Sequence, residues 1–242
     1  MRITACTHPG CRHDENQDNF RGGRLSDDSY WVVLCDGMGG ATSGGMASEM
    51  AVDFLTEKLN SESVELTAEQ QIKDFMLDIV KQCNELILKR SQNPEQPVTM
   101  GTTVVMALIK GNKCHLVHAG DSRAYILRKN DLTQVTHDHS IVQELLDSGK
   151  ITPAQAQNHP NKNIITSALG VDANTRVDYK ELPVGKNEML LVCSDGLTNM
   201  VREEDIISIL KEPDFFRTAD HLIDKAVEAG GLDNITAVVV SI

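Results

Sequence analysis

Five aspartates lie where apolar stretches of the sequence begin or end. Asp36 follows YWVVLC, Asp121 follows LVHAG, Asp195 follows LLVCS, Asp233 precedes NITAVVV, and Asp18 lies in ENQDNF. One aspartate at the end of a strand is ordinary turn chemistry. Five carboxylates that converge at the ends of packed strands would repel each other and raise each other's pKa. The pattern therefore predicts that cations hold these side chains together.

The type of ligand atom indicates which cations to expect. No histidine or cysteine pair in the sequence has the spacing of a zinc site, and oxygen ligands favour hard ions such as Mg²⁺ or Mn²⁺. Two such ions would balance four carboxylates. Gly37 can offer its carbonyl oxygen to a metal, and Gly39 and Gly40 leave room for a substrate. Two ions about 3.5 to 4 Å apart that share a water would lower its pKa and direct it at phosphorus, so we expect hydrolysis of a phosphoester.

The composition limits the class of protein. The chain has 242 residues, is 40% apolar and carries a formal net charge of -12, which argues against nucleic acids and anionic membrane surfaces as partners. No apolar stretch approaches the roughly 20 residues of a membrane span, and the N-terminus lacks the apolar core of a secretion signal. The six cysteines form no C-x-x-C pair, so we expect a reduced, cytoplasmic protein.

The apolar pattern also predicts the elements that must position the aspartates. Helices are expected around Ala47 to Leu55, after a capping box at Thr67, and after Ser140 and Thr152. Two more are expected at 203–210 and 219–227, and strands at 3–7, 30–35, 102–109, 114–120, 122–128, 132–136, 189–196 and 234–242.

The order of these elements predicts an α+β fold. Successive hairpins imply antiparallel pairing, and two helix pairs that enclose two stacked antiparallel β-sheets would bury both faces of each sheet, in a four-layer αββα sandwich. The polar segment at about 138–167 has little to bury and is expected to form a flap over the sheet. Because the sequence contains no linker and no repeat, we expect a single domain over 1–242.

Seven segments, taken together and in order, resemble the motifs of the PPM/PP2C family of metal-dependent Ser/Thr protein phosphatases in its bacterial form. They are ENQDNF, CDGMGG, MGTT, AGDSRAY, SALG, CSDGLTNM and GGLDNIT, and they cover essentially the whole chain. The resemblance implies the same sandwich and hydrolysis by a water that bridges two Mn²⁺ or Mg²⁺ ions. It implies these ligands to the two ions, directly or through water: Asp18, Asp36, Asp195, Asp233 and the carbonyl of Gly37.

The resemblance implies further roles around these ligands. Asp121 matches the acid of a third, weaker metal site, and Asn234 would support Asp233. Arg12 matches the arginine that holds the substrate phosphate, a role suited to a planar guanidinium. The family usually places that arginine five residues before the first aspartate, whereas the gap here is six and His13 stands at the usual position. Arg12 is therefore the first candidate and His13 the alternative.

The resemblance also implies the partners. The substrates would be proteins phosphorylated on serine or threonine, with a cognate Ser/Thr kinase that opposes the enzyme in signal transduction, and we expect a monomer. Members outside bacteria often carry histidine, a proposed general acid, where this chain has Met38, which cannot donate a proton. The sequence leaves open which group protonates the leaving alcohol.

Two rival functions fit parts of the sequence. Cys6 and Arg12, in CTHPGCR, have the C-x₅-R spacing of cysteine-dependent phosphatases, but Asp14 and Glu15 follow the arginine and are unfavourable beside a phosphate. The other is a catalytically inactive homologue that binds phosphoproteins. Such a chain would have lost a metal carboxylate, whereas this sequence keeps all four.

Overall fold

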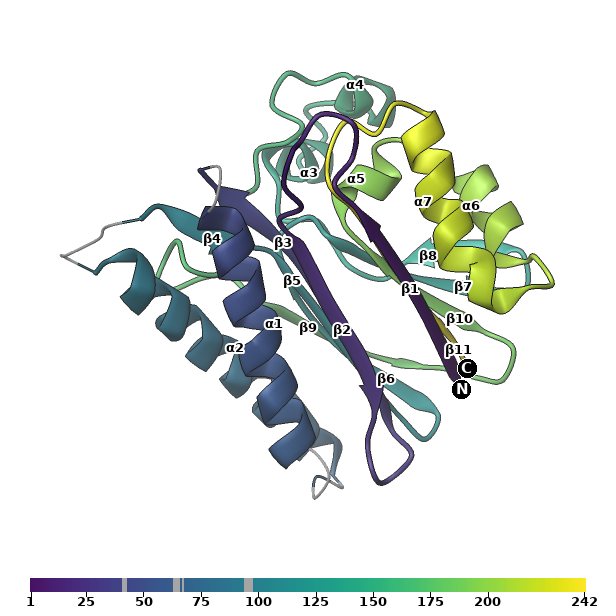
Figure 1. Cartoon of the computed structure of the whole chain (residues 1–242), viewed down its shortest axis with the longest axis horizontal. Coiled ribbons are helices and arrows are strands. Elements are labelled where there is room, and N and C mark those ends of the chain that lie inside the picture. Colours follow the sequence, from purple (N-terminus) through teal and green to yellow (C-terminus); the bar gives the residue numbers. More distant parts are fainter. Residues whose placement is uncertain (41–42, 63–65, 67, 94–97) are drawn as a thin grey trace.

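Two antiparallel sheets lie face to face in the middle of the molecule, with helices over both outer faces (Figure 1). The computed structural model describes residues 1–40, 43–62, 66, 68–93 and 98–242. The order of strands in the first sheet is β1 (Arg2–His8), β11 (Ile235–Ser241), β10 (Met189–Cys193), β7 (Arg123–Arg128) and β8 (Asp131–Gln134). The order in the second is β2 (Asp18–Arg24), β3 (Tyr30–Gly39), β5 (Val104–Lys110), β6 (Lys113–Ala119) and β9 (Asp178–Pro183), with β4 (Met100–Thr102) paired to β3.

Alternate side chains of the central strands enter two different cores, which explains their continuous apolar runs. In β3, Val32 and Leu34 pack between the two sheets, whereas Val33 and Cys35 pack under helices α1 (Ser43–Glu62) and α2 (Glu69–Ser91). Strand β10 behaves likewise under α6 (Glu203–Leu210) and α7 (Thr218–Glu228). The predicted αββα sandwich is confirmed.

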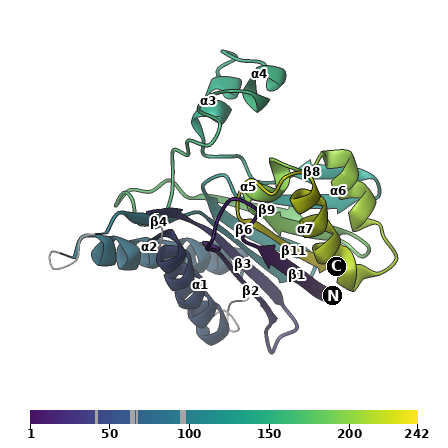
Figure 2. The ribbon, with the colours of Figure 1, turned by 45° about the horizontal axis from the view of Figure 1, so that its top comes forward.

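Helices α3 (Ile141–Asp147) and α4 (Pro153–Gln157) project from the sandwich, away from the four layers (Figure 2). Both begin where the sequence predicts. The Ser140 hydroxyl accepts a hydrogen bond from the Gln143 amide at the start of α3. Thr152 and Gln155 form a reciprocal capping box at the start of α4. The capping box expected at Thr67 lies outside the described residues, and α2 begins at Glu69.

Several elements differ from expectation. The strand predicted over 102–109 is interrupted at Thr103, which separates β4 from β5. A four-residue helix, α5 (Asp195–Thr198), follows β10 directly, so Asp195 begins a helix. Strands β2 and β9, the two outer strands of the second sheet, were not predicted. Within the described residues, no helix has both the length and the apolar character needed to cross a membrane.

Candidate active site

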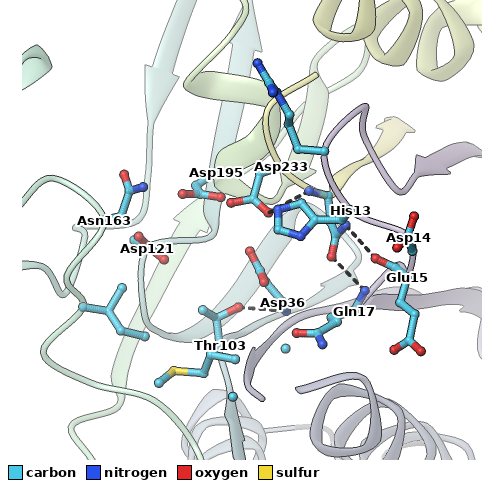
Figure 3. Close-up of a pocket in the computed structure, with 16 residues that line it drawn as sticks. His13, Asp14, Glu15, Gln17, Asp36, Thr103, Asp121, Asn163, Asp195 and Asp233 are labelled. Atoms are coloured by element: carbon cyan, nitrogen blue, oxygen red, sulfur yellow. Dashed lines mark hydrogen bonds and ion pairs between the residues drawn. The ribbon is translucent and has the colours of Figure 1, made fainter. Parts of the chain in front are cut away.

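A cleft of about 580 Å³ opens where loops of both sheets meet (Figure 3). It collects most of the side chains that the sequence singles out, from positions far apart in the chain. The predicted residues that line it are Arg12, His13, Asp36, Gly37, Asp121, Asp195, Asp233 and Asn234. The cleft is also lined by Thr103 and by Asn163 and Ile165, which were not predicted. Asn163 and Ile165 belong to the projecting segment, residues 138–167, which carries α3 and α4.

Asp18 does not line the cleft but lies behind it, 5% exposed. It is the antiparallel partner of Asp36 in the β2–β3 register, which places two aspartates side by side. Its Oδ2 accepts hydrogen bonds from the hydroxyls of Ser194 and Thr236, both at 2.7 Å, and so connects the two sheets. Its Oδ1 is buried, with no hydrogen-bond partner among the described residues. Burial raises the pKa of Asp18 to about 7, and the charges of Asp195 and Asp233 act in the same direction.

The backbone of Asp36 is held by hydrogen bonds to Thr103, and its side chain lines the cleft. Its amide donates to the Thr103 hydroxyl at 3.0 Å, and its carbonyl accepts from the Thr103 amide at 2.8 Å. Burial and the charges of neighbouring aspartates raise the pKa of Asp36 well above its ordinary value. Residue 37, which follows, must be glycine, because a Cβ there would lie 2.2 Å from the Gly44 carbonyl oxygen. This steric reason adds to the need for access to the Gly37 carbonyl.

Asp195 and Asp233 are brought together by a close approach of α5 to the start of β11. A Cβ on Gly196 would lie 2.0 Å from the Asn234 carbonyl oxygen, so only glycine allows this contact. The Asp195 carboxylate accepts a hydrogen bond from the Asn199 side chain at 2.9 Å. Burial, followed by the charge of Asp233, raises the pKa of Asp195 to about 6.

Asn234 fastens the loop that carries Arg12 and His13. Its side chain accepts a hydrogen bond from the Gln17 amide at 2.8 Å and donates to the carbonyls of Pro9 and Glu15 at 2.8 and 3.1 Å. Only its backbone amide contacts Asp233, at 2.8 Å from Oδ1. The structure therefore relates Asn234 mainly to the loop of residues 9–17.

The three candidate residues near the N-terminus have different surroundings. His13 Nε2 lies 3.4 Å from Asp233 Oδ1. Arg12 lines the cleft and forms no hydrogen bond or ion pair with the described residues. Cys6 lies within β1, away from the lining of the cleft, and burial together with a hydrogen bond to Asp220 raises the pKa of its thiol. A cysteine nucleophile needs a lowered pKa, so this geometry does not support cysteine-dependent hydrolysis.

Asp121 lies across the cleft from His13 and Glu15, on the same side as Asn163 (Figure 3). Burial raises the pKa of Asp121 to about 8, and the charges of Asp195 and Asp138 contribute. Nearby, Arg123 donates to both carboxylate oxygens of Asp138, with the shortest distance 2.6 Å between Nη2 and Oδ2. This pair anchors the beginning of the projecting segment next to Asp121.

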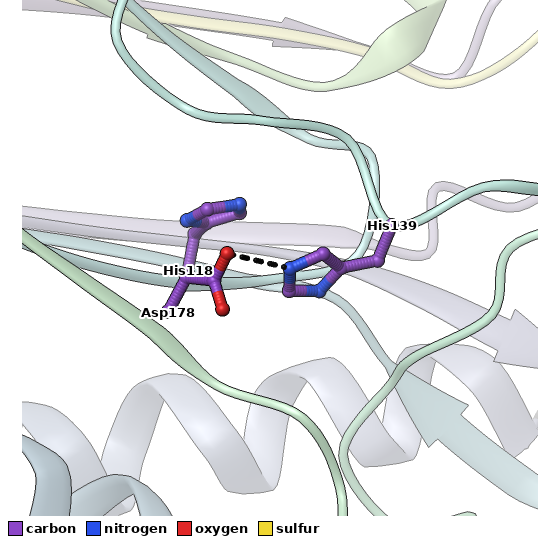
Figure 4. A group of neighbouring side chains, drawn as sticks. All are labelled: His118, His139 and Asp178. Atoms are coloured by element: carbon purple, nitrogen blue, oxygen red, sulfur yellow. Dashed lines mark ion pairs between the residues drawn. The ribbon is translucent and has the colours of Figure 1, made fainter. Parts of the chain in front are cut away.

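A second group of polar side chains lies at the base of the same segment and consists of His118, His139 and Asp178 (Figure 4). Their ligand atoms lie within 4.8 Å of one another, which makes a metal site worth testing. Burial lowers the pKa of His139, so its ring is neutral at pH 7, and its Nδ1 accepts a hydrogen bond from the Gly120 amide. The ring proton must then lie on Nε2, which faces Asp178 Oδ2 at 3.3 Å, so this nitrogen has no lone pair to offer a metal.

The aspartate cluster, by contrast, fits hard cations. Its donors are oxygens, one buried carboxylate oxygen of Asp18 lacks a partner among the described residues, and mutual proximity raises several of the pKa values. Buried carboxylates of this kind are stable as anions only when cations or donors compensate them. The donor set of the residues present therefore fits Mg²⁺ or Mn²⁺.

Comparisons with known proteins agree with this chemistry. The family model described as Protein phosphatase 2C matches residues 11–230. The serine/threonine phosphatase stp of Listeria welshimeri is 40% identical over 230 residues, which cover 95% of this chain and 90% of the relative. The solved serine/threonine phosphatase of S. agalactiae superposes with a TM-score of 0.93 at 34% identity and covers 100% of this chain and 99% of its own. The catalytic domain of PstP in complex with two manganese ions gives 0.85 at 32% identity, covering 98% and 96%.

Proposed function

Because this chain belongs to the protein phosphatase 2C family and is a protein serine/threonine phosphatase, we propose that its aspartate cluster binds two Mn²⁺ or Mg²⁺ ions to hydrolyse phosphoserine and phosphothreonine esters. The observation that carries the proposal is the convergence of Asp36, Asp121, Asp195 and Asp233 on one cleft, with Asp18 directly behind it. Carboxylates so placed require cations, and oxygen donors select hard ones.

Each carboxylate has a distinct place in the proposed site. Asp36, Asp195 and Asp233 would hold the two ions from the lining of the cleft, together with the carbonyl of Gly37. Asp18 would contribute its unpartnered Oδ1 from behind. Asp121, on the opposite side, would hold a third ion more weakly. When bound, the ions would supply Lewis acidity and lower the pKa of water so that water can attack phosphorus.

Arg12 would bind the phosphoryl group of the substrate. Its guanidinium has no partner among the described residues, and its five N–H donors match phosphate oxygens. His13 fits this role less well, because it lies against Asp233. Asn234 would keep the Arg12 loop at the correct distance from the aspartates, since it binds that loop at three backbone positions.

The proposed substrates are proteins that a Ser/Thr kinase has phosphorylated. We further propose that 1–242 acts as one catalytic domain and as a monomer, with the segment 138–167 as a flap beside the cleft. In support, this segment contributes Asn163 and Ile165 to the lining.

The proposed function is tested by hydrolysis of a phosphothreonine peptide and of p-nitrophenyl phosphate with Mn²⁺, with Mg²⁺ and with EDTA. We expect release of phosphate with either ion and none with EDTA. Activity that survives EDTA but is lost after treatment with iodoacetamide would contradict the proposal and favour a cysteine nucleophile.

A further inference from the structure

A second groove, with a volume of about 750 Å³, adjoins the catalytic cleft and shares Asp121 and Asp195 with it. Its floor is formed by β7 and β8, one wall by the segment that carries α3 and α4, and the other wall by α5 and the start of α6. Because the two spaces meet at these aspartates, a polypeptide that places a phosphoryl group in the cleft can continue into the groove.

The groove has a mixed interior, in which apolar side chains lie beside polar ones such as Asp138 and Ser140, and charged edges. Leu132, Val142 and Val201 are buried within it. Glu203 and Glu204, in the first turn of α6, are exposed at one edge and form no ion pair within the described part of the chain. Arg202 precedes Glu203 and carries the opposite charge. Its Nε lies 3.5 Å from Asp205 Oδ2, so Arg202 is paired with Asp205 and not with Glu203 or Glu204.

The wall opposite α6 is held in place by its base. The Thr166 amide donates to the His139 carbonyl at 2.8 Å, and the Ile141 amide donates to the Ile164 carbonyl at 3.0 Å, so the outgoing and returning chains are paired. The His139 amide in turn donates to the Gly120 carbonyl at 2.9 Å, one residue before Asp121. These bonds hold the base of this wall to the sandwich without a ligand, and a wall that is already ordered lowers the entropic cost of binding.

We propose that this groove binds the residues that flank the phosphorylated residue of the substrate protein, and that Glu203 and Glu204 select basic side chains there. The proposal rests on the phosphatase function proposed above. An extended chain directs alternate side chains to opposite sides, so one set faces α6 and the next faces the opposite wall. That opposite wall carries Lys162, so the α6 edge is where a lysine or arginine of the substrate finds opposite charge.

The test compares phosphothreonine peptides that differ only in carrying three lysines or three glutamates, on either the N-terminal or the C-terminal side of the phosphothreonine. With Mn²⁺, we expect the wild-type enzyme to hydrolyse the lysine peptide about fivefold better in kcat/KM than the glutamate peptide when the charged residues are on one side of the phosphothreonine. A factor of this size corresponds to the combined contribution of two partly exposed ion pairs. The double variant Glu203→Lys/Glu204→Lys should reverse this preference, and Glu203→Gln/Glu204→Gln, which disturbs the helix less, should abolish it.

A matched control distinguishes the effect of charges at the groove from the effect of the net charge of the whole protein. Glu49 and Glu85 are exposed on α1 and α2, and Glu49→Lys/Glu85→Lys changes the net charge by the same amount. This control should keep the wild-type preference. A wild-type enzyme indifferent to the flanks, a glutamine variant that still prefers the basic peptide, or a control that loses the preference equally would overturn the proposal.

The phosphatase function is judged separately in the same experiment. Hydrolysis of p-nitrophenyl phosphate, which has no flanking residues, reports on the catalytic cleft alone. If no substrate is hydrolysed with Mn²⁺, the proposed function fails. If all peptides are hydrolysed at equal rates, only the assignment of the groove fails.

Discussion

At the scale of single residues, the site is made of side chains that are costly to bury. Asp18 and Asp36 are neighbours in the β2–β3 register, and burial raises the pKa of both. Hydroxyls and amides compensate only part of this charge: Ser194 and Thr236 bind one oxygen of Asp18, and Asn199 binds one oxygen of Asp195. The remaining carboxylate oxygens are those that we expect to bind cations.

The substitution Asp36→Asn tests this directly. It keeps the shape of the side chain but removes a charge from the cluster, so we expect kcat to fall by about 100-fold or more, the upper range for groups that support a metal site. Without metal, the same variant should unfold at a temperature no lower than the wild type, because one repelling carboxylate is gone. Thermal unfolding in EDTA and steady-state kinetics with Mn²⁺ measure both effects, and a variant with near-normal kcat would remove Asp36 from the site.

Arg12 and His13 are distinguished by their effect on KM. Loss of a charge-assisted contact to phosphate costs about 2 kcal/mol, so Arg12→Ala should raise KM for p-nitrophenyl phosphate by roughly 10-fold or more. His13→Ala should have a smaller effect, since His13 lies against Asp233. The reverse order of effects would show that His13 is the phosphate-binding residue.

At the scale of elements, the base of the projecting segment contains an ion pair between the half-buried Arg123 and the buried Asp138. Arg123 contacts Asp138 through Nε and Nη2, and the Asp138 side chain is 6% exposed. Removal of Asp138 leaves the charge of Arg123, whose side chain is 29% exposed, without its carboxylate partner. Asp138 of this pair lies three residues before the start of α3, and the charges of both partners act on the pKa of Asp121.

We expect Asp138→Asn to lower the free energy of unfolding by about 2 kcal/mol, between the losses for a fully buried and an exposed pair. Asp53→Asn serves as the control, because Asp53 and its partner Arg21 are both more than half exposed. That change should cost less than about 1 kcal/mol. Urea denaturation of both variants provides the comparison, and equal losses would contradict the structural role of the Arg123–Asp138 pair.

The elements also show which parts of the structure could be predicted from the sequence. Helices α3 and α4 were predicted at their caps, and β3 and β10 from their apolar runs, because these signals are local. Strands β2 and β9 were missed because each lies at an edge of the second sheet, where polar residues face outward and no continuous apolar run is needed.

The aspartates illustrate the same limit within the site. Their types and their positions at strand ends pointed to a common cluster. Their surroundings could not be predicted, because they depend on long-range pairing: Asp18 meets Ser194 and Thr236 across 176 and 218 residues of sequence. Asn163 carried no signal in the sequence, since only the pairing of 139–141 with 164–166 brings it to the cleft.

At the scale of the whole molecule, we expect protons and cations to compete for one acidic cluster. Burial and mutual repulsion raise the pKa of Asp195 to about 6, of Asp18 to about 7 and of Asp121 to about 8. Groups with a raised pKa in the folded state contribute stability at low pH, and this contribution is lost as pH rises through those values. Without metal, repulsion between these carboxylates is therefore stronger near pH 8 than at lower pH, and the ionised carboxylates can bind cations there.

The affinity for Mn²⁺ should accordingly increase with pH. Between pH 8 and pH 6 the aspartates gain protons that a cation must displace, so the apparent dissociation constant should rise by at least about 10-fold. Calorimetric titration in two buffers of different ionisation enthalpy would also detect the released protons. An affinity that is constant over this range would mean that the cluster is ionised without help from cations.

The central claim is that these aspartates bind a pair of hard cations, and anomalous scattering from crystals soaked in Mn²⁺ tests it most directly. We predict two strong peaks about 3.5 to 4 Å apart, between Asp36, Asp195 and Asp233, with a weaker third beside Asp121. Peaks confined to His118, His139 and Asp178, or no peak within the cleft, would contradict the account.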